Sequence, residues 1–307
     1  MEEINTEIME STDDFKVLEE ELLPPVNEFK RFIRVFFRRK VVIVGFALVV
    51  IILFVAIFAD VIAPYDPYRQ NLQNVLQPPS AQHLLGTDAL GRDLLSRIMH
   101  GSRIALISGV VTVLISASIG TVIGVTAGFL RGRIQGVIMR ITDAIIAIPA
   151  LILQLLIVSI LGAGVTGVIV AVGLTLFPGY IRLMNGQVMS LRENDYVLAG
   201  RAMGDRKWRI IVRHILPNAM SPLIVMMTMM LGVAIMAEAG LSFLGLGISP
   251  PTAAWGQMCR EGYRYLESLP LLSIAPGVAI MILVFAYNMV GDGLRDALDP
   301  RLRGSLD

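Results

Sequence analysis

The sequence predicts an all-α integral membrane protein with six transmembrane helices and both termini in the cytoplasm. The first observation is composition. Of the 307 residues, 55% are hydrophobic and 17% are charged, whereas about 25% are charged in a typical soluble domain. The second is the grouping of apolar residues into long uncharged runs, which membrane spans require. The third is a strong asymmetry of Lys and Arg between alternate loops.

Uncharged runs mark the membrane spans in order along the chain. They cover residues 41–59, 104–130, 144–181, 218–237 and 271–291. At about 1.5 Å per residue the first run covers most of a hydrocarbon core about 30 Å thick, and we place the first helix at 41–63. The third run is too long for one crossing, and Gly162-Ala163-Gly164 interrupts it. It therefore predicts a hairpin of two spans, at about 138–161 and 165–185, with a kink at Pro149.

The residues before the first span predict a cytoplasmic tail and not a cleaved signal. Residues 1–40 are acidic at first and basic next to the membrane. The apolar run that follows them is too long for the hydrophobic region of a secretory signal. We therefore expect an uncleaved anchor, preceded by a basic juxtamembrane segment.

The distribution of basic residues predicts which loops face the cytoplasm. With the N-terminus inside, 20 of the 26 Lys and Arg residues fall on the cytoplasmic side, as the positive-inside rule requires. This orientation makes residues 64–103 extracytoplasmic and residues 298–307 a cytoplasmic tail. It also places the loop at 186–216 in the cytoplasm, within a five-helix core at 104–297.

The loop at 186–216 predicts a short helix, a turn and a second helix at the membrane surface. Ala199, Ala202 and Met203 favour helix, and Gly204 would end it. A second helical stretch at 207–215 then leads to Pro217, in the first turn of the fifth span. The residue pattern alone leaves two interpretations open: a topology signal, or a docking surface.

This loop resembles the EAA loop that identifies permease subunits of ABC importers. Leu198-Ala199-Gly200 occupies the first triplet of that pattern, Gly204 has the required spacing, and Leu216-Pro217 closes it. Leu198 replaces the family's Glu, and Gly200 replaces its second Ala. The resemblance implies a coupling loop that docks on an ATPase and could pair its cations with acidic residues there. The residues expected to form it are Ala199, Gly200, Arg201, Ala202, Gly204, Asp205, Arg206, Lys207, Arg209 and Pro217.

Further motifs narrow the resemblance to the second, C-type permease subunit of dipeptide, oligopeptide and nickel importers. They read HLLGTDALGRDLLSRIMHGSRIAL at 83–106, RHILPN at 213–218, EAGLSFLGLG at 238–247 and GDGLRDALDPR at 291–301. The resemblance implies the type I ABC importer architecture in a bacterial or archaeal cytoplasmic membrane. It also implies a homologous second permease subunit, two cytoplasmic ATPase subunits that bind the ATP, and an extracytoplasmic substrate-binding protein, with the lipid bilayer as environment and no nucleic acid.

The sequence contains no motif for chemistry of its own. The phosphate-loop pattern GxxxxGK[ST] and the zinc pattern HExxH do not occur, and the three histidines lack metal-ligand spacing. We therefore expect a permease that is not an enzyme and binds no cofactor or metal. Its expected substrate is a peptide, with nickel or another small solute as the alternative. A self-sufficient secondary transporter would need an ionisable residue at mid-membrane, and only Glu238 is a candidate.

Three further features carry structural expectations. Glu238, deep in the fifth span, could line the translocation path or brace the permease pair. Ser116, Gly120, Gly124 and Gly128 are spaced four apart and predict close helix packing, within the subunit or against a partner permease. In the external segment, Thr87 or Asp88 could cap an interfacial helix that carries Leu90 and Leu94 on one face. This helix could also help to receive the binding protein.

Overall fold

The computed structural model describes residues 28–298, which are helical except for turns and an external segment after the first long helix. Its helices are α2 (Glu28–Phe36), α3 (Lys40–Ile62), α4 (Leu94–Leu130), α5 (Gly132–Ile146), α6 (Ala150–Leu161), α7 (Val165–Leu191), α8 (Asp195–Ala202), α9 (Lys207–Ile210), α10 (Leu216–Leu244), α11 (Trp255–Tyr263) and α12 (Leu271–Leu298). The predicted acidic tail and all but the first residue of the predicted C-terminal tail lie outside the described range.

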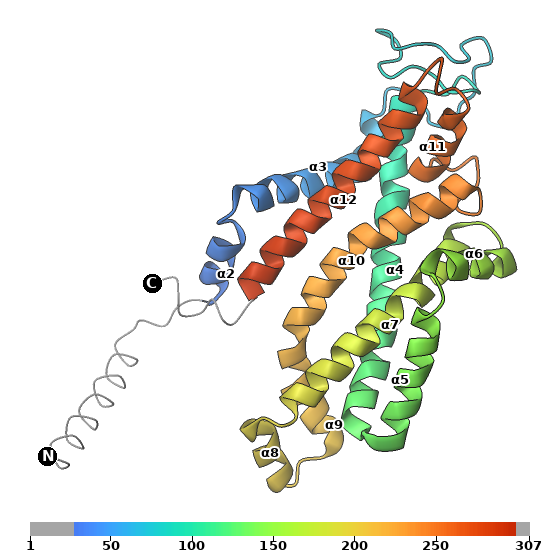
Figure 1. The fold of residues 1–307 in the computed structure, drawn as a ribbon. Coiled ribbons are helices and arrows are strands. Elements are labelled where there is room, and N and C mark those ends of the chain that lie inside the picture. Colours follow the sequence, from blue (N-terminus) through green and yellow to red (C-terminus); the bar gives the residue numbers. More distant parts are fainter. Residues whose placement is uncertain (1–27, 299–307) are drawn as a thin grey trace, which may run out of the picture.

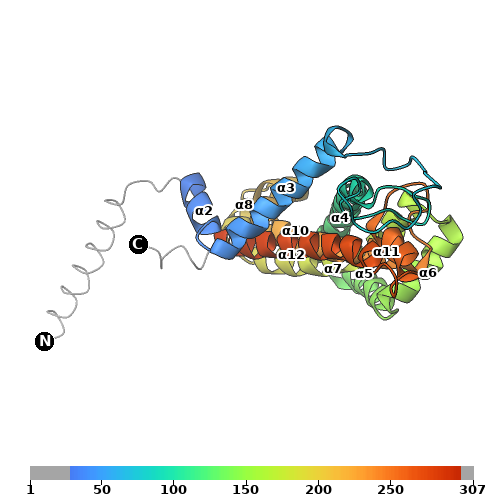
Figure 2. The ribbon, with the colours of Figure 1, turned by 90° about the horizontal axis from the view of Figure 1, so that it is seen from above.

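Long apolar helices make up most of the described chain, so the prediction of an all-α membrane protein is confirmed. The helices α3, α4, α7, α9 with α10, and α12 are each long and apolar enough to cross a membrane. The pair α5 and α6 would provide the sixth span if the two helices cross as one unit. Figure 1 shows α4 reaching from one end of the bundle to the other, with α10 and α12 side by side. Figure 2 shows α3 lying across α12.

The third predicted span is broken more sharply than expected. Instead of one kinked helix over 138–161, the chain forms α5 and α6, which meet at 90°. Pro149 has no N–H for the helical hydrogen-bond ladder, and it disfavours helical geometry at Ile148. The predicted interruption after α6 is present, because Gly162 and Gly164 have φ values of 88° and 143°.

The second helix of the predicted loop is continuous with the fifth span. We expected a separate surface helix at 207–215, but α9, a π-helical turn (Ile211–Ile215) and α10 form one run, Lys207–Leu244. Pro217 cannot donate a hydrogen bond to the carbonyl four residues earlier. The π-turn accommodates this, since the Leu216 N–H donates to the Ile211 carbonyl five residues back.

The interfacial helix expected in the external segment does not form. Asp88 instead shapes a turn, accepting hydrogen bonds from the backbone N–H groups of Leu90 (2.8 Å) and Arg92 (3.0 Å). The helix begins only at Leu94, where the Asp93 carboxylate accepts from the Ser96 N–H at 2.8 Å and acts as the N-cap. From there α4 continues for 37 residues as the second span.

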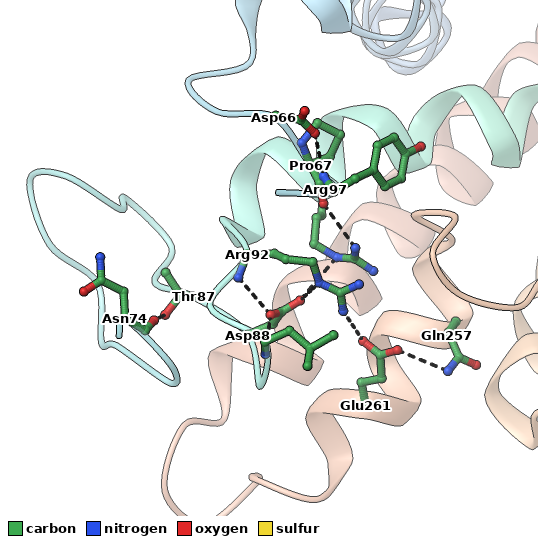
Figure 3. Close-up of polar contacts among 11 residues, drawn as sticks. Asp66, Pro67, Asn74, Thr87, Asp88, Arg92, Arg97, Gln257 and Glu261 are labelled. Atoms are coloured by element: carbon green, nitrogen blue, oxygen red, sulfur yellow. Dashed lines mark hydrogen bonds and ion pairs between the residues drawn. The ribbon is translucent and has the colours of Figure 1, made fainter. Parts of the chain in front are cut away.

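A buried charge cluster joins the external segment to α4 and α11 (Figure 3). The Asp88 carboxylate lies 2.6 Å from Nε of Arg92 and 3.5 Å from Nε of Arg97. Nη2 of Arg92 lies 3.2 Å from the Glu261 carboxylate on α11. Arg97 is 1% exposed and donates to the Pro67 carbonyl at 3.3 Å. The cluster therefore fixes the end of the bundle that carries α11.

The small-residue stripe of α4 lies directly against α7. A Cβ added to Gly120 would lie 2.5 Å from the Tyr180 Cβ. One added to Gly124 would lie 2.6 Å from the Ile181 carbonyl oxygen, and one on Gly128 would lie 2.8 Å from the Val188 Cβ. At the head of the stripe, the Ser116 hydroxyl donates to the Gly173 carbonyl at 3.2 Å. Small residues thus let two membrane helices approach closely.

We predict opposite effects for alanine at two helical glycines. Gly124→Ala should destabilise the chain by about 1–3 kcal/mol, because the new methyl group overlaps the backbone of α7. The methyl group of Gly136→Ala on α5 would meet no atom within 4 Å. This substitution should stabilise the chain by roughly 0.5–1 kcal/mol, because alanine lowers the backbone entropy of the unfolded state. Thermal unfolding of the purified, detergent-solubilised chain measures both. Equal unfolding temperatures for the two variants would contradict the packing argument.

Candidate functional site

The predicted coupling loop contains a helix with well-defined ends. Asp195 lies in the first turn of α8 and Arg201 in its last turn. Both charges therefore interact favourably with the helix dipole and stabilise α8. Gly204 has φ of 84° and ends the helix as predicted. Its N–H donates to the Arg201 carbonyl at 3.0 Å, and the Asp205 N–H donates to the Gly200 carbonyl at 3.0 Å. These two bonds form a Schellman motif, which requires a left-handed residue at Gly204.

The loop begins later than predicted, because α7 continues to Leu191 instead of ending near residue 185. It then occupies one end of the bundle, where Figure 1 shows α8 beyond the end of α7 and α9 leading back into α10. Val197 and Gly200 are buried and hold α8 against the rest of the chain. Most of the remaining predicted loop residues are exposed at this end. The exposed members are Ala199, Arg201, Ala202, Gly204, Arg206, Lys207, Arg209 and Pro217.

The cations of the loop divide into two groups. Nη1 of Arg209 lies 3.1 Å from the Asp205 carboxylate, and the Arg201 guanidinium lies 5.7 Å from the centroid of the Phe129 ring. For Arg206 and Lys207 the described residues provide no ion-pair partner within 4.0 Å. Arg213 is likewise exposed without such a partner, so at least three cations of the described loop carry charge that no carboxylate of the chain neutralises.

Two bulky apolar side chains of the loop are exposed, and the sequence analysis did not predict them as contact residues. Met203 is 80% exposed and Trp208 is 73% exposed, on either side of the Gly204 turn. Met203 lies outside the candidate spans, whereas Trp208 lies at the start of the run Lys207–Leu244. Exposed large apolar residues occur at protein contact surfaces, and Trp is also enriched at membrane–water interfaces. In the sequence, these two residues stand out as bulky apolar residues within a basic loop. A loop that only sets the membrane orientation needs Lys and Arg alone.

Glu238 is enclosed within this chain, on α10. It is 3% exposed, and the Ser242 hydroxyl donates to its carboxylate at 2.8 Å. The Ile248 N–H in turn donates to the Ser242 hydroxyl at 3.1 Å. Glu238 thereby links α10 to the turn that follows it, close to α11.

The histidines lie apart, each beside one carboxylate. Nδ1 of His83 is 2.9 Å from Asp93, Nε2 of His100 is 3.1 Å from Asp60, and Nε2 of His214 is 3.9 Å from Asp205. Within residues 28–298, no cluster of three or more His, Cys, Asp or Glu side chains is arranged to hold a metal ion.

Comparison with known families places this fold and loop in a defined class. The model of the "Binding-protein-dependent transport system inner membrane component" family matches residues 120–304, more than half of the chain. The "N-terminal TM domain of oligopeptide transport permease C" matches residues 27–79. The two matches leave between them residues 80–119, which hold the last part of the external segment and about the first two thirds of α4.

Several curated relatives are similar over nearly their full length. The di/tripeptide transport system permease protein DppC of Pseudomonas aeruginosa is 42% identical over 285 residues, which cover 91% of this chain and 94% of that protein. The glutathione transport system permease protein GsiD of Pectobacterium atrosepticum is 39% identical over 276 residues, covering 90% and 92%. The GsiD protein of an Escherichia coli strain is 40% identical over 281 residues.

A solved structure supports the architecture. A chain of the methionine ABC transporter MetNI in an inward-facing conformation superposes with a TM-score of 0.57 at 21% identity, covering 67% of this chain and 98% of that one. At this identity the likeness concerns the fold alone. It confirms the predicted type I ABC importer architecture for the part it covers.

The fold and the exposed loop define a permease subunit of an ABC importer. The chain belongs to the family of binding-protein-dependent transport system inner membrane components. It is a multi-pass protein of an inner-membrane transport system, and it is a transport component without a catalytic step of its own. Both the predicted family and the prediction that the chain is not an enzyme are confirmed.

Cys259 on α11 provides a test of burial at the opposite end of the bundle. Burial raises the pKa of its thiol to about 11, so at pH 8 the fraction of reactive thiolate is about 100-fold lower than for a thiol of pKa 9. We expect maleimide labelling to be slow and to keep accelerating up to pH 10. An exposed comparator, Ala199→Cys in a Cys259→Ser chain, should label faster at pH 8, and its rate should begin to level off between about pH 9 and pH 10, where the Cys259 rate still rises about tenfold per pH unit. Equal labelling rates at pH 8 would contradict the partial burial of Cys259.

Proposed function

We propose that this chain forms one half of a peptide-import pathway and couples to ATPase subunits through the loop between α7 and α10. The observation that carries the proposal is the projecting loop: a Schellman turn at Gly204, flanked by exposed Met203 and Trp208 and by the unpaired cations Arg206 and Lys207. Such a surface suits a partner with an apolar recess and an acidic rim. Leu198 stands where the family carries Glu. Docking of this loop therefore depends on the shape of the Gly204 turn and on the cations around it.

The proposal includes the arrangement of the complete transporter. The chain pairs with a homologous second permease subunit, two cytoplasmic ATPase subunits bind the ATP, and an extracytoplasmic binding protein delivers the substrate. Both termini and the loop face the cytoplasm, which agrees with the asymmetry of Lys and Arg. The relatives reported above are bacterial, and we place this chain in a bacterial cytoplasmic membrane.

Peptides are the proposed substrate class. Relatives named for di/tripeptide transport and for glutathione transport are similar at 42% and 39% identity, and glutathione is itself peptide-like. The shared sequence spans the whole permease core, so the pathway that this chain contributes suits small peptides. Nickel or another small solute remains the alternative for the same architecture.

The coupling role predicts a specific defect for Gly204→Val. A β-branched residue cannot adopt φ of 84° without strain, so the Schellman turn and the positions of Met203 and Trp208 should be lost. We expect membrane insertion to remain normal, while ATP-driven dipeptide uptake by the reconstituted complex falls by about tenfold or more.

Gly132→Val is the matched control for this experiment. Gly132 also has a left-handed φ, of 63°, and open space around it, but it begins α5. The control should therefore suffer similar backbone strain and keep its uptake coupled to ATP hydrolysis. Normal uptake in Gly204→Val, or an equal loss in both variants, would contradict docking through this loop.

The substrate proposal predicts the outcome of a competition assay. In proteoliposomes with the complete transporter and its binding protein, unlabelled di- and tripeptides, including glutathione, should suppress uptake of a labelled dipeptide. Nickel at the same concentration should leave that uptake unchanged. ATP-dependent nickel uptake without peptide uptake would reject the peptide assignment and leave the ABC permease assignment intact.

A further inference from the structure

A cavity of about 450 Å³ lies between the coupling loop and the ends of α4 and α7. Its cations come from three places in the chain: Arg131 follows α4, Arg192 follows α7, and Arg201 and Lys207 belong to the loop. Elements far apart in the sequence thus bring four positive side chains to one open pocket.

Negative charge at this cavity is too small to balance the four cations. Asp205 is the one carboxylate in its lining, and it already contacts Arg209 at 3.1 Å and His214 at 3.9 Å. Glu193, just outside, is shared between Arg131 and Arg192. The space therefore keeps a net positive potential and favours an anion.

Arg192 adds a second, independent observation. It is 2% exposed, its Nη1 donates to the Gly128 carbonyl at 2.8 Å, and its Nε lies 3.3 Å from the Glu193 carboxylate. Its Nη2 has no hydrogen-bond partner in the described part of the chain. Buried donors are nearly always satisfied, so this guanidinium calls for an additional acceptor from outside the chain.

The walls of the cavity indicate what kind of anion fits. Phe129, Leu130 and Ile210 form an apolar side next to the cations. The volume falls within the usual range for small-ligand sites, about 300–1,000 Å³, and leaves room for more than a bare ion. Planar guanidinium groups match the oxygens of phosphate with paired hydrogen bonds.

We propose that this cavity binds a phosphate group, contributed either by the headgroup of an anionic phospholipid or by free phosphate. Arg192 would hold it from the helix side, and Arg201 and Lys207 from the loop side. A bound phosphate would thereby tie the coupling loop to the ends of α4 and α7. This inference goes beyond the import function and does not depend on which substrate is carried.

Native mass spectrometry of the full-length chain in detergent tests the proposal in two arms. One arm titrates dioctanoyl phosphatidylglycerol, and the other titrates inorganic phosphate. We expect saturable binding of one equivalent in at least one arm. In the double variant Arg201→Gln/Lys207→Gln, affinity should fall by about tenfold or more, because two charged donors are lost. These residues lie at the loop side, so the bundle should still fold, and thermal unfolding checks this.

The matched control is Arg206→Gln/Arg213→Gln, which removes two exposed loop cations that do not line the cavity. Its affinity should stay within about twofold of the unsubstituted chain, since surface charges contribute weakly. Binding in the lipid arm alone identifies a headgroup site, and binding in the phosphate arm identifies a site for free phosphate. The absence of saturable binding in both arms, or an equal loss in the control, would overturn the proposal.

Discussion

The close approach of α4 and α7 is the contact on which the rest of the structure depends. Lipid is as apolar as the side chains, so membrane helices associate through tight packing and not through the hydrophobic effect. Gly120, Gly124 and Gly128 of α4 provide that packing, because a Cβ on any of them would overlap α7. At the end of the stripe, the Gly128 carbonyl accepts from Arg192. The same packing therefore determines where the loop leaves the bundle and where the cationic cavity forms.

The two ends of the bundle are stabilised by different means. At the α11 end, Asp88, Arg92 and Arg97 form a buried cluster that holds the external segment against the helices (Figure 3). Removing one member would leave an uncompensated buried charge, which is far more costly than losing a surface pair. At the α8 end, backbone bonds of the Gly204 turn maintain the loop, and its side chains stay exposed. One end is held by buried ion pairs, and the other presents exposed cations and apolar side chains.

The sequence correctly predicted helix ends at glycines and a break at a proline, because these residues restrict or free the backbone at their own position. Gly204 ends α8, and the glycines at 162–164 separate α6 from α7, because both places need φ values that other residues avoid. Pro149 was expected to kink a span, but the size of the bend, 90°, depends on how α6 packs against α7. Asp88 was expected to cap a helix and instead makes a turn, because Asp93 offers the better cap five residues later.

By itself, the sequence determined the class of protein, the sites of most spans and the turn at Gly204 in the loop between α7 and α10. These follow from hydrophobic length, from the count of basic residues and from motifs with fixed spacing, all of which act within a short stretch of chain. Only the tertiary structure decided that Glu238 is enclosed, that Met203 and Trp208 are exposed, and that Arg192 meets the loop cations around one cavity. Exposure and charge convergence depend on which distant helices pack together, and no local pattern contains that information.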